Sequence, residues 1–158
     1  MATHSPNTPP FEAEPQTSDI VLRMSRALDA LEDVIAREAE LNAVESVTAY
    51  DASLRIQEFA FERMEAALRA VIDSEPVSRG DAILRHLARL TYAAISVDPG
   101  TGLRAPADAV AHFVGECGGL DLPHRGLLDR ADVQVGLYTQ AFGQMDIWDE
   151  ELFAAPIS

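Results

Sequence analysis

The stretch SDIVLRMSRALDALEDVI, residues 18–35, decides the fold class of this chain. Its large apolar side chains recur at intervals of three or four residues, which places them on one face of an α-helix. This stripe consists of Val21, Met24, Leu28, Leu31 and Ile35. Ser18 stands directly before it, and serine caps helix N-termini because its side-chain oxygen accepts from a free backbone N–H. We therefore predict a helix from Ser18 to about Ala43.

A second apolar stripe of the same spacing predicts a helix from about Thr48 to Asp73. It consists of Val47, Tyr50, Leu54, Phe61, Met64, Leu68 and Val71. The two stripes lose register between Asn42 and Tyr50, so we expect a turn there and an antiparallel hairpin of two long helices. The alternative is one continuous helix, which would be about 80 Å long and would leave much of its stripe uncovered.

Two shorter helices are predicted next. The first begins at Ser78, which is followed three residues later by Asp81, a combination that resembles a capping box. The next helix carries Pro106 in its first turn, where proline is tolerated, and ends at Gly118 and Gly119.

The helix expected after Pro123 is less clearly patterned. Apolar residues again step by three and four, but the letters VQVGLY also alternate as in a strand. Gly136 and Gly143 would each cost a helix about 1 kcal/mol relative to alanine. The sequence offers no second strand with which VQVGLY could pair. We therefore predict an all-α, single-domain bundle of five or six helices over residues 18–158. Residues 1–17, with four of the nine prolines, are predicted to be a disordered arm.

The composition excludes several kinds of chemistry. All 12 basic residues are arginine, against 26 acidic residues, and the net charge is -14. Mechanisms that need a lysine, as a phosphate ligand, a Schiff base or a general base, are therefore excluded. The negative charge of the chain repels the phosphates of nucleic acid and disfavours it as a partner. A basic partner or plain solubility fits this charge better, and the arginine and alanine usage suggests a bacterial source of high GC content. Cys117 is the single cysteine, and the sequence contains neither a secretory signal nor an apolar run long enough to span a membrane, so we expect a cytoplasmic protein with no membrane association.

No stretch of the sequence matches a specific catalytic or cofactor motif, and we expect neither enzymatic activity nor a cofactor. Asp108, His112 and Glu116 lie in one line on a predicted helix, but four supported metal ligands are not present, so we interpret them as a solvated face and expect no metal site. His124 stands beside Pro123 in a predicted loop and has no local partners in the sequence.

His86 is the one histidine with an alternative functional interpretation. A histidine phosphotransfer domain is a helical bundle with an exposed histidine followed by a basic residue, and the pair His86 and Arg89 resembles this arrangement. The resemblance implies phosphotransfer at His86. It stops at Leu90, which stands where such domains keep a small residue, and the Arg85 and Arg89 pair is more simply explained by ion pairing with neighbouring helices.

The second predicted helix has a further apolar face, which a helix at the periphery of a soluble bundle would not need. Its members are Ala52, Ile56, Phe59, Arg63, Ala66 and Ala70. A helix that is apolar on most sides is usually buried, so we favour a central position for this helix. The alternative is that Ile56 and Phe59 bind another protein or a second copy of the chain.

The segment DIWDEELF, residues 146–153, contains the only tryptophan. Asp146 could cap a short helix whose Trp148, Leu152 and Phe153 are spaced like the anchors of a helix that lies in an apolar groove. We favour the interpretation in which they fold back as a lid over Ile56 and Phe59, or over Val133 and Leu137.

Taken together, these patterns predict a non-catalytic intracellular protein that binds a protein partner or itself, with a homodimer as one possibility. The predicted binding residues are Ile56, Phe59, Trp148, Leu152 and Phe153. The alternatives are phosphotransfer at His86 and the binding of a small apolar ligand between the helices.

Overall fold

The computed structural model describes residues 17–97 and 104–154, with side chains described as far as Gly143. These ranges contain five α-helices and no strand, so the predicted all-α bundle is confirmed. The helices are α2 (Asp19–Asn42), α3 (Val47–Ile72), α4 (Arg79–Ser96), α5 (Arg104–Glu116) and α6 (Leu122–Ala154). The predicted arm, apart from Thr17, lies outside the described residues.

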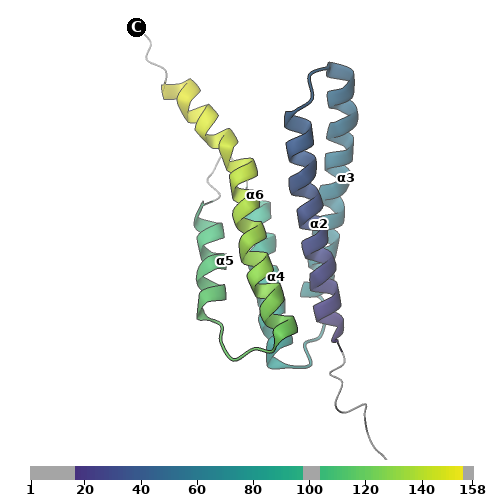
Figure 1. Cartoon of the computed structure of the whole chain (residues 1–158), viewed down its shortest axis with the longest axis vertical. Coiled ribbons are helices and arrows are strands. Elements are labelled where there is room, and N and C mark those ends of the chain that lie inside the picture. Colours follow the sequence, from purple (N-terminus) through teal and green to yellow (C-terminus); the bar gives the residue numbers. More distant parts are fainter. Residues whose placement is uncertain (1–16, 98–103, 155–158) are drawn as a thin grey trace, which may run out of the picture.

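Four helices surround the core, and the fifth packs against one side of the bundle (Figure 1). The α2–α3 hairpin is antiparallel, as predicted, and it packs against α4 and α6, which lie side by side. α5 packs against α4 and α6 only. α2, α4 and α6 are parallel and begin at the same end of the bundle, because α3 and α5 run antiparallel to them and return the chain to that end.

Serine side chains begin the first three of these helices. Ser18 Oγ accepts from the Val21 N–H at 3.2 Å, and Ser78 Oγ accepts from the Asp81 N–H at 3.1 Å, so both predicted caps are confirmed. Ser46 caps α3 in the same way. Each cap satisfies a backbone donor that has no partner within its own helix.

The core lies between α2, α3, α4 and α6 and extends to Val110 and Val114 of α5. Its largest fully buried side chains are Ile20, Met24, Leu28, Leu31, Met64, Leu68, Leu84, Leu87 and Leu128. Aromatic rings close the core towards the C-terminal half of α6. Phe61 makes edge contacts with Tyr138 and Phe142, and Tyr138 stacks on Phe142 at a centroid distance of 4.4 Å. Burial, with a smaller contribution from the nearby Glu38 carboxylate, raises the pKa of Tyr138 to about 12.

Arginine side chains join the helices through backbone carbonyl groups rather than through carboxylates alone. Five arginines donate in this way to another helix or to a connecting segment: Arg23 to Ala70, Arg79 to Gly118, Arg85 to Ile72, Arg125 to Cys117 and Arg130 to Ser25. The predicted ion pair for Arg85 is therefore wrong. Its guanidinium binds a free carbonyl at the C-terminal end of α3, where a positive charge is favoured by the helix dipole.

Two details of the predicted helices are wrong. A separate helix beginning at Asp146 does not exist, because α6 runs without interruption from Leu122 to Ala154 and includes Gly136 and Gly143. The buried face of α6 outweighs the low helix propensity of these glycines. The central position expected for α3 is also wrong, since Ile56 and Phe59 are exposed.

Truncation of a core leucine provides a direct test of this packing. Leu28 is completely buried, so Leu28→Ala should lower the free energy of unfolding by about 2–5 kcal/mol, through lost apolar contact and the cavity that remains. Leu122 is 87% exposed, and Leu122→Ala should change the same quantity by no more than about 0.5 kcal/mol. Urea unfolding measures both. Equal effects of the two substitutions would contradict the described core.

Candidate functional site

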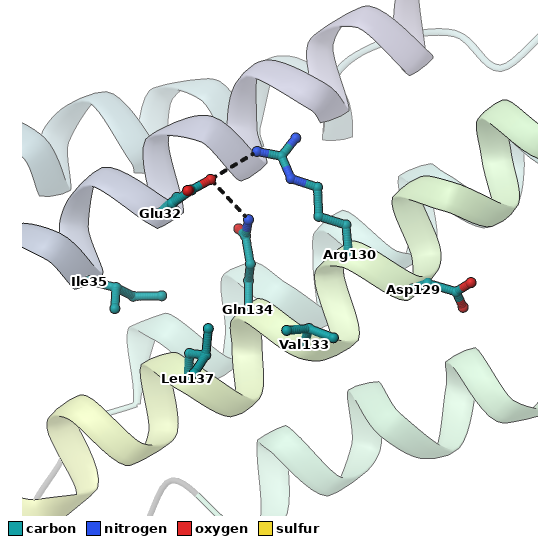
Figure 2. A pocket seen from close by; sticks show the side chains of 7 residues that line it. All are labelled: Glu32, Ile35, Asp129, Arg130, Val133, Gln134 and Leu137. Carbon is teal, nitrogen blue, oxygen red and sulfur yellow. Dashed lines mark hydrogen bonds and ion pairs between the residues drawn. The ribbon is translucent and has the colours of Figure 1, made fainter.

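An apolar groove of about 410 Å³ lies between α2 and α6; we refer to it as the α2–α6 groove. Its lining residues are Glu32, Ile35, Asp129, Arg130, Val133, Gln134 and Leu137 (Figure 2). Val133 and Leu137 project from successive turns of α6 and are 62% and 46% exposed. Such exposure of neighbouring aliphatic side chains beside a concave surface is typical of a binding site.

Polar side chains hold one end of the groove in place. Arg130 Nη2 lies 2.5 Å from Asp29 Oδ1 and 3.3 Å from Glu32 Oε2, which joins α6 to α2. Burial lowers the pKa of Arg130, but the hydrogen bonds to Asp29 and Glu32 outweigh burial and raise it. Gln134, which is buried, lies beside Glu32 in Figure 2. Arg130 and Glu32 are thus bound to each other at this end, and Ile35, Val133 and Leu137 form the apolar part of the groove.

The predicted binding residues of α3 form a second apolar surface. Ile56 is 46% exposed and Phe59 is 65% exposed, one helical turn apart on the same face. Arg63 lies one turn further and binds Asp33 of α2 at 2.7 Å. Since Glu32 lines the groove on the other flank of α2, the structure does not bring the α3 surface and the α2–α6 groove into one site.

The three remaining predicted binding residues are Trp148, Leu152 and Phe153. They lie in the last turns of α6, and their side chains are outside the described part of the structure. Both interpretations of this segment, as a lid and as a docking helix, therefore stay predictions.

His86 is exposed on α4, and its ring lies 4.7 Å from the ring of Phe113 in α5. Phe113 thus covers part of the surface through which a phosphoryl donor would approach the imidazole. Arg85 is bound to the Ile72 carbonyl, and Arg69, from α3, donates to the Tyr92 hydroxyl at 2.7 Å. Phosphotransfer at His86 stays an untested prediction.

Sequence reasoning missed a cluster of polar side chains around His124, which we call the His124 cluster; it consists of Ser18, Asp81, Asp121 and His124. The ring Nε2 lies 2.9 Å from Asp81 Oδ1, and Nδ1 lies 2.5 Å from Asp121 Oδ1. The same Asp81 oxygen accepts from the Ser18 hydroxyl at 2.7 Å. His124 and Asp81 are buried, with exposed fractions of 9% and 1%.

The fold assembles this cluster from three helix N-termini. Ser18 caps α2, Asp81 is in the first turn of α4, and His124 is in the first turn of α6. The N-terminal end of a helix carries a partial positive charge, which stabilises a buried carboxylate. Gly80 makes room for the imidazole, because a Cβ at this position would lie 2.6 Å from His124 Cδ2.

The two carboxylates and the imidazole shift one another's ionisation. Hydrogen bonds to His124 lower the pKa of Asp121. Burial raises the pKa of Asp81, but hydrogen bonds from His124, Ser18 and Val77 outweigh it and lower that pKa. Burial lowers the pKa of His124, and the bonds to Asp81 and Asp121 overcome this and raise it. The cluster therefore favours two carboxylates with a protonated imidazole between them.

In the His124 cluster, the hydroxyl of Ser18 donates to a carboxylate rather than to the imidazole. It is therefore not activated as a nucleophile by a neighbouring base. Among the residues that the structure describes, no group of three or more histidine, cysteine or acidic side chains is placed to hold a metal ion. None of the helices in the described ranges has the length and apolar character needed to cross a membrane.

Comparison with known proteins identified no relative of this chain. No protein-family model matches the chain, and searches of curated proteins and of solved structures also gave no match.

The space beside Gly80 can be tested by adding a methyl group. Gly80→Ala should lower the free energy of unfolding by about 1–3 kcal/mol, since the new Cβ would displace the His124 ring from Asp81. Gly126 is exposed on α6 and has no atom within 4 Å of such a Cβ. Gly126→Ala should therefore raise stability by about 0.5–1 kcal/mol through helix propensity alone. Urea unfolding of both variants is the measurement, and a stabilised Gly80→Ala protein would show that the ring is not held there.

Proposed function

We propose that this chain is a non-catalytic helical protein that binds a partner protein through apolar helix surfaces, and that the α2–α6 groove is its main binding site. The observation that supports this proposal is the exposure of Val133 and Leu137 beside Ile35 in a concave apolar surface. A helix that presents apolar side chains at intervals of three and four residues would match the two successive turns of α6.

The charge of the chain narrows the choice of partner. A net charge of -14 repels nucleic acid, and we propose a protein partner with basic residues beside its apolar stripe. We further propose that the protein acts in the bacterial cytoplasm in a regulatory role. The single free Cys117 and the absence of lysine support a cytoplasmic, bacterial origin, while the surplus apolar surface supports regulation through binding.

Site-specific crosslinking tests the groove. A photoreactive amino acid at position 137 should attach a defined partner in the source cell, whereas the same group at the exposed position 122, outside the groove, should not. With the partner identified and purified, Val133→Asp should weaken binding at least about tenfold, because it places a charge in the apolar contact. Titration calorimetry measures the affinity.

A matched control for the groove is Val77→Asp, since Val77 is 81% exposed and does not line the groove. This variant should bind the partner as the wild type does. The proposal is contradicted if crosslinks from positions 137 and 122 give the same products, or if Val133→Asp and Val77→Asp bind equally well.

The α3 surface supports self-association as a second proposal. Ile56 and Phe59 are flanked by the exposed small residues Ala52 and Ala66, which would let a second helix approach closely. We expect sedimentation equilibrium to detect a dimer that Phe59→Asp converts to a monomer and Val77→Asp leaves intact. A wild-type protein that stays monomeric at all accessible concentrations would exclude this second proposal without affecting the first.

The small-ligand alternative keeps one supporting observation, the groove volume of about 410 Å³. This lies within the range of roughly 300–1,000 Å³ that is usual for sites of drug-sized molecules. We favour a protein partner because Val133 and Leu137 lie at an open surface of α6 rather than in an enclosed cavity.

A further inference from the structure

The first turns of three helices meet at His124, and we propose that this residue acts as a pH-responsive clamp between them. In this proposal the protonated imidazole holds the start of α6 against α4 and, through Asp81 and Ser18, against α2. Loss of the proton removes the bond between His124 and Asp121 and loosens the first turn of α6, whereas the bond to Asp81 remains. The proposal is independent of which partner the protein binds.

The geometry around the imidazole favours the protonated form when both neighbouring groups are carboxylates. Both ring nitrogens lie within hydrogen-bond distance of a carboxylate oxygen, at 2.9 Å for Nε2 and 2.5 Å for Nδ1. A neutral imidazole has one N–H donor, and its other nitrogen carries a lone pair. Either neutral tautomer would therefore direct a lone pair at a carboxylate oxygen, of Asp81 or of Asp121. Only the imidazolium donates to both.

The charged groups that face His124 come from two sides. Asp81 contacts it from α4 and Asp121 from the segment before α6, whereas α2 contributes the neutral hydroxyl of Ser18 through Asp81. Arg79 and Arg125 belong to α4 and α6, but they donate to the carbonyls of Gly118 and Cys117. Within the described residues, the imidazole is thus the only basic group bonded to either carboxylate.

Deprotonation should affect the two contacts differently. The Asp81 side chain is 1% exposed and cannot turn to water, so the remaining ring N–H should stay with it. The Asp121 side chain is 64% exposed and can turn towards solvent. Asp121 Oδ1 also accepts from the backbone N–H of His124, which caps α6. Loosening should therefore begin at Asp121 and the first turn of α6, while α4 stays in place.

The direction of the pH dependence follows from proton linkage. The pKa of His124 is raised above its ordinary value of 6.5, so the stabilisation is complete below pH 6.5 and is lost as the pH rises through the native pKa. The pKa values of Asp81 and Asp121 are lowered from 3.8, so their contribution is lost only as the pH falls below that value. The clamp is strongest between these two limits.

Proton NMR of the full chain tests the protonation state. The imidazole signal of His124, assigned by its absence in His124→Gln, should titrate with a midpoint above 6.5. Asp121→Asn removes one of the two carboxylates while keeping a residue type that caps helices, and it should lower that midpoint. A midpoint at or below 6.5 in the wild type, or one that Asp121→Asn leaves unchanged, would overturn the proposal.

Stability measurements test the mechanical consequence. Between pH 6.5 and the native midpoint, the unfolding equilibrium constant of the wild type should rise by up to about tenfold per pH unit, because the folded state binds one more proton. His124→Gln should lack this part of the pH profile. If His124→Gln does not fold, Asp121→Asn provides the comparison, since its lower midpoint should end the rise at a lower pH and make the total rise above pH 6.5 smaller. Identical profiles in the wild type and the folded variant would contradict the clamp.

Hydrogen exchange locates the change in the native protein. After correction for the intrinsic pH dependence of exchange, amides in the first turns of α6 should lose protection above the His124 midpoint. Amides in the middle of α3 should keep their protection across the same pH range. Uniform loss along the chain would indicate a general decrease in stability rather than release of a clamp, and it would contradict the proposal.

Discussion

The carboxylate of Asp81 is buried where the first turns of α2, α4 and α6 meet, and the arrangement of the bundle depends on its being satisfied there. A buried charge without partners would cost several kcal/mol. Here the Ser18 hydroxyl, the Val77 N–H and the His124 ring bind it, and the positive ends of the helix dipoles surround it. Ser18 and His124 can reach Asp81 only if α2, α4 and α6 begin at the same end of the bundle. For this, α3 and α5 must run antiparallel to them and bring the chain back to that end.

The opposite end of the bundle is held by different forces. There the α2–α3 hairpin and the C-terminal half of α6 diverge, and α6 leans away from the hairpin (Figure 1). Phe61, Tyr138 and Phe142 fill the interior, and Gln57 donates to the buried carboxylate of Glu38 at 2.9 Å. The α2–α6 groove lies between the two ends. The His124 cluster therefore fixes the helices at one end, aromatic packing and one polar pair hold the other, and apolar surface stays exposed along α6.

Local patterns in the sequence predicted the helices well. The starts of α2 and α4 follow from serine caps and from a spacing of three and four, both of which are properties of a few neighbouring residues. The position of α3 could not be predicted, because an apolar face containing Phe59 has the same pattern whether a neighbouring helix or solvent covers it. The continuity of α6 was missed because Asp146 is equally acceptable as a cap and as an interior residue.

The candidate sites were predictable only in part. Periodicity placed Ile56 and Phe59 on one apolar face, and the structure leaves both exposed, so their role in binding stays a prediction. The His124 cluster was missed because Asp81 is 43 residues from His124 in the sequence, and their contact exists only after α4 and α6 align. The one local signal was Asp121, three residues before His124, which is the spacing of a helix cap. The groove likewise needs α2 and α6, which are distant in sequence.

The arginines that donate to backbone carbonyls have a consequence for the response of this protein to salt. Carbonyl oxygens are neutral groups, so screening by dissolved ions weakens these contacts less than it weakens partly exposed ion pairs such as Arg37 with Asp33. The net charge of -14 meanwhile produces repulsion within the folded chain, and salt reduces that repulsion. Salt thus removes a destabilising repulsion while it leaves these contacts largely intact. High ionic strength should therefore favour the compact state of this protein.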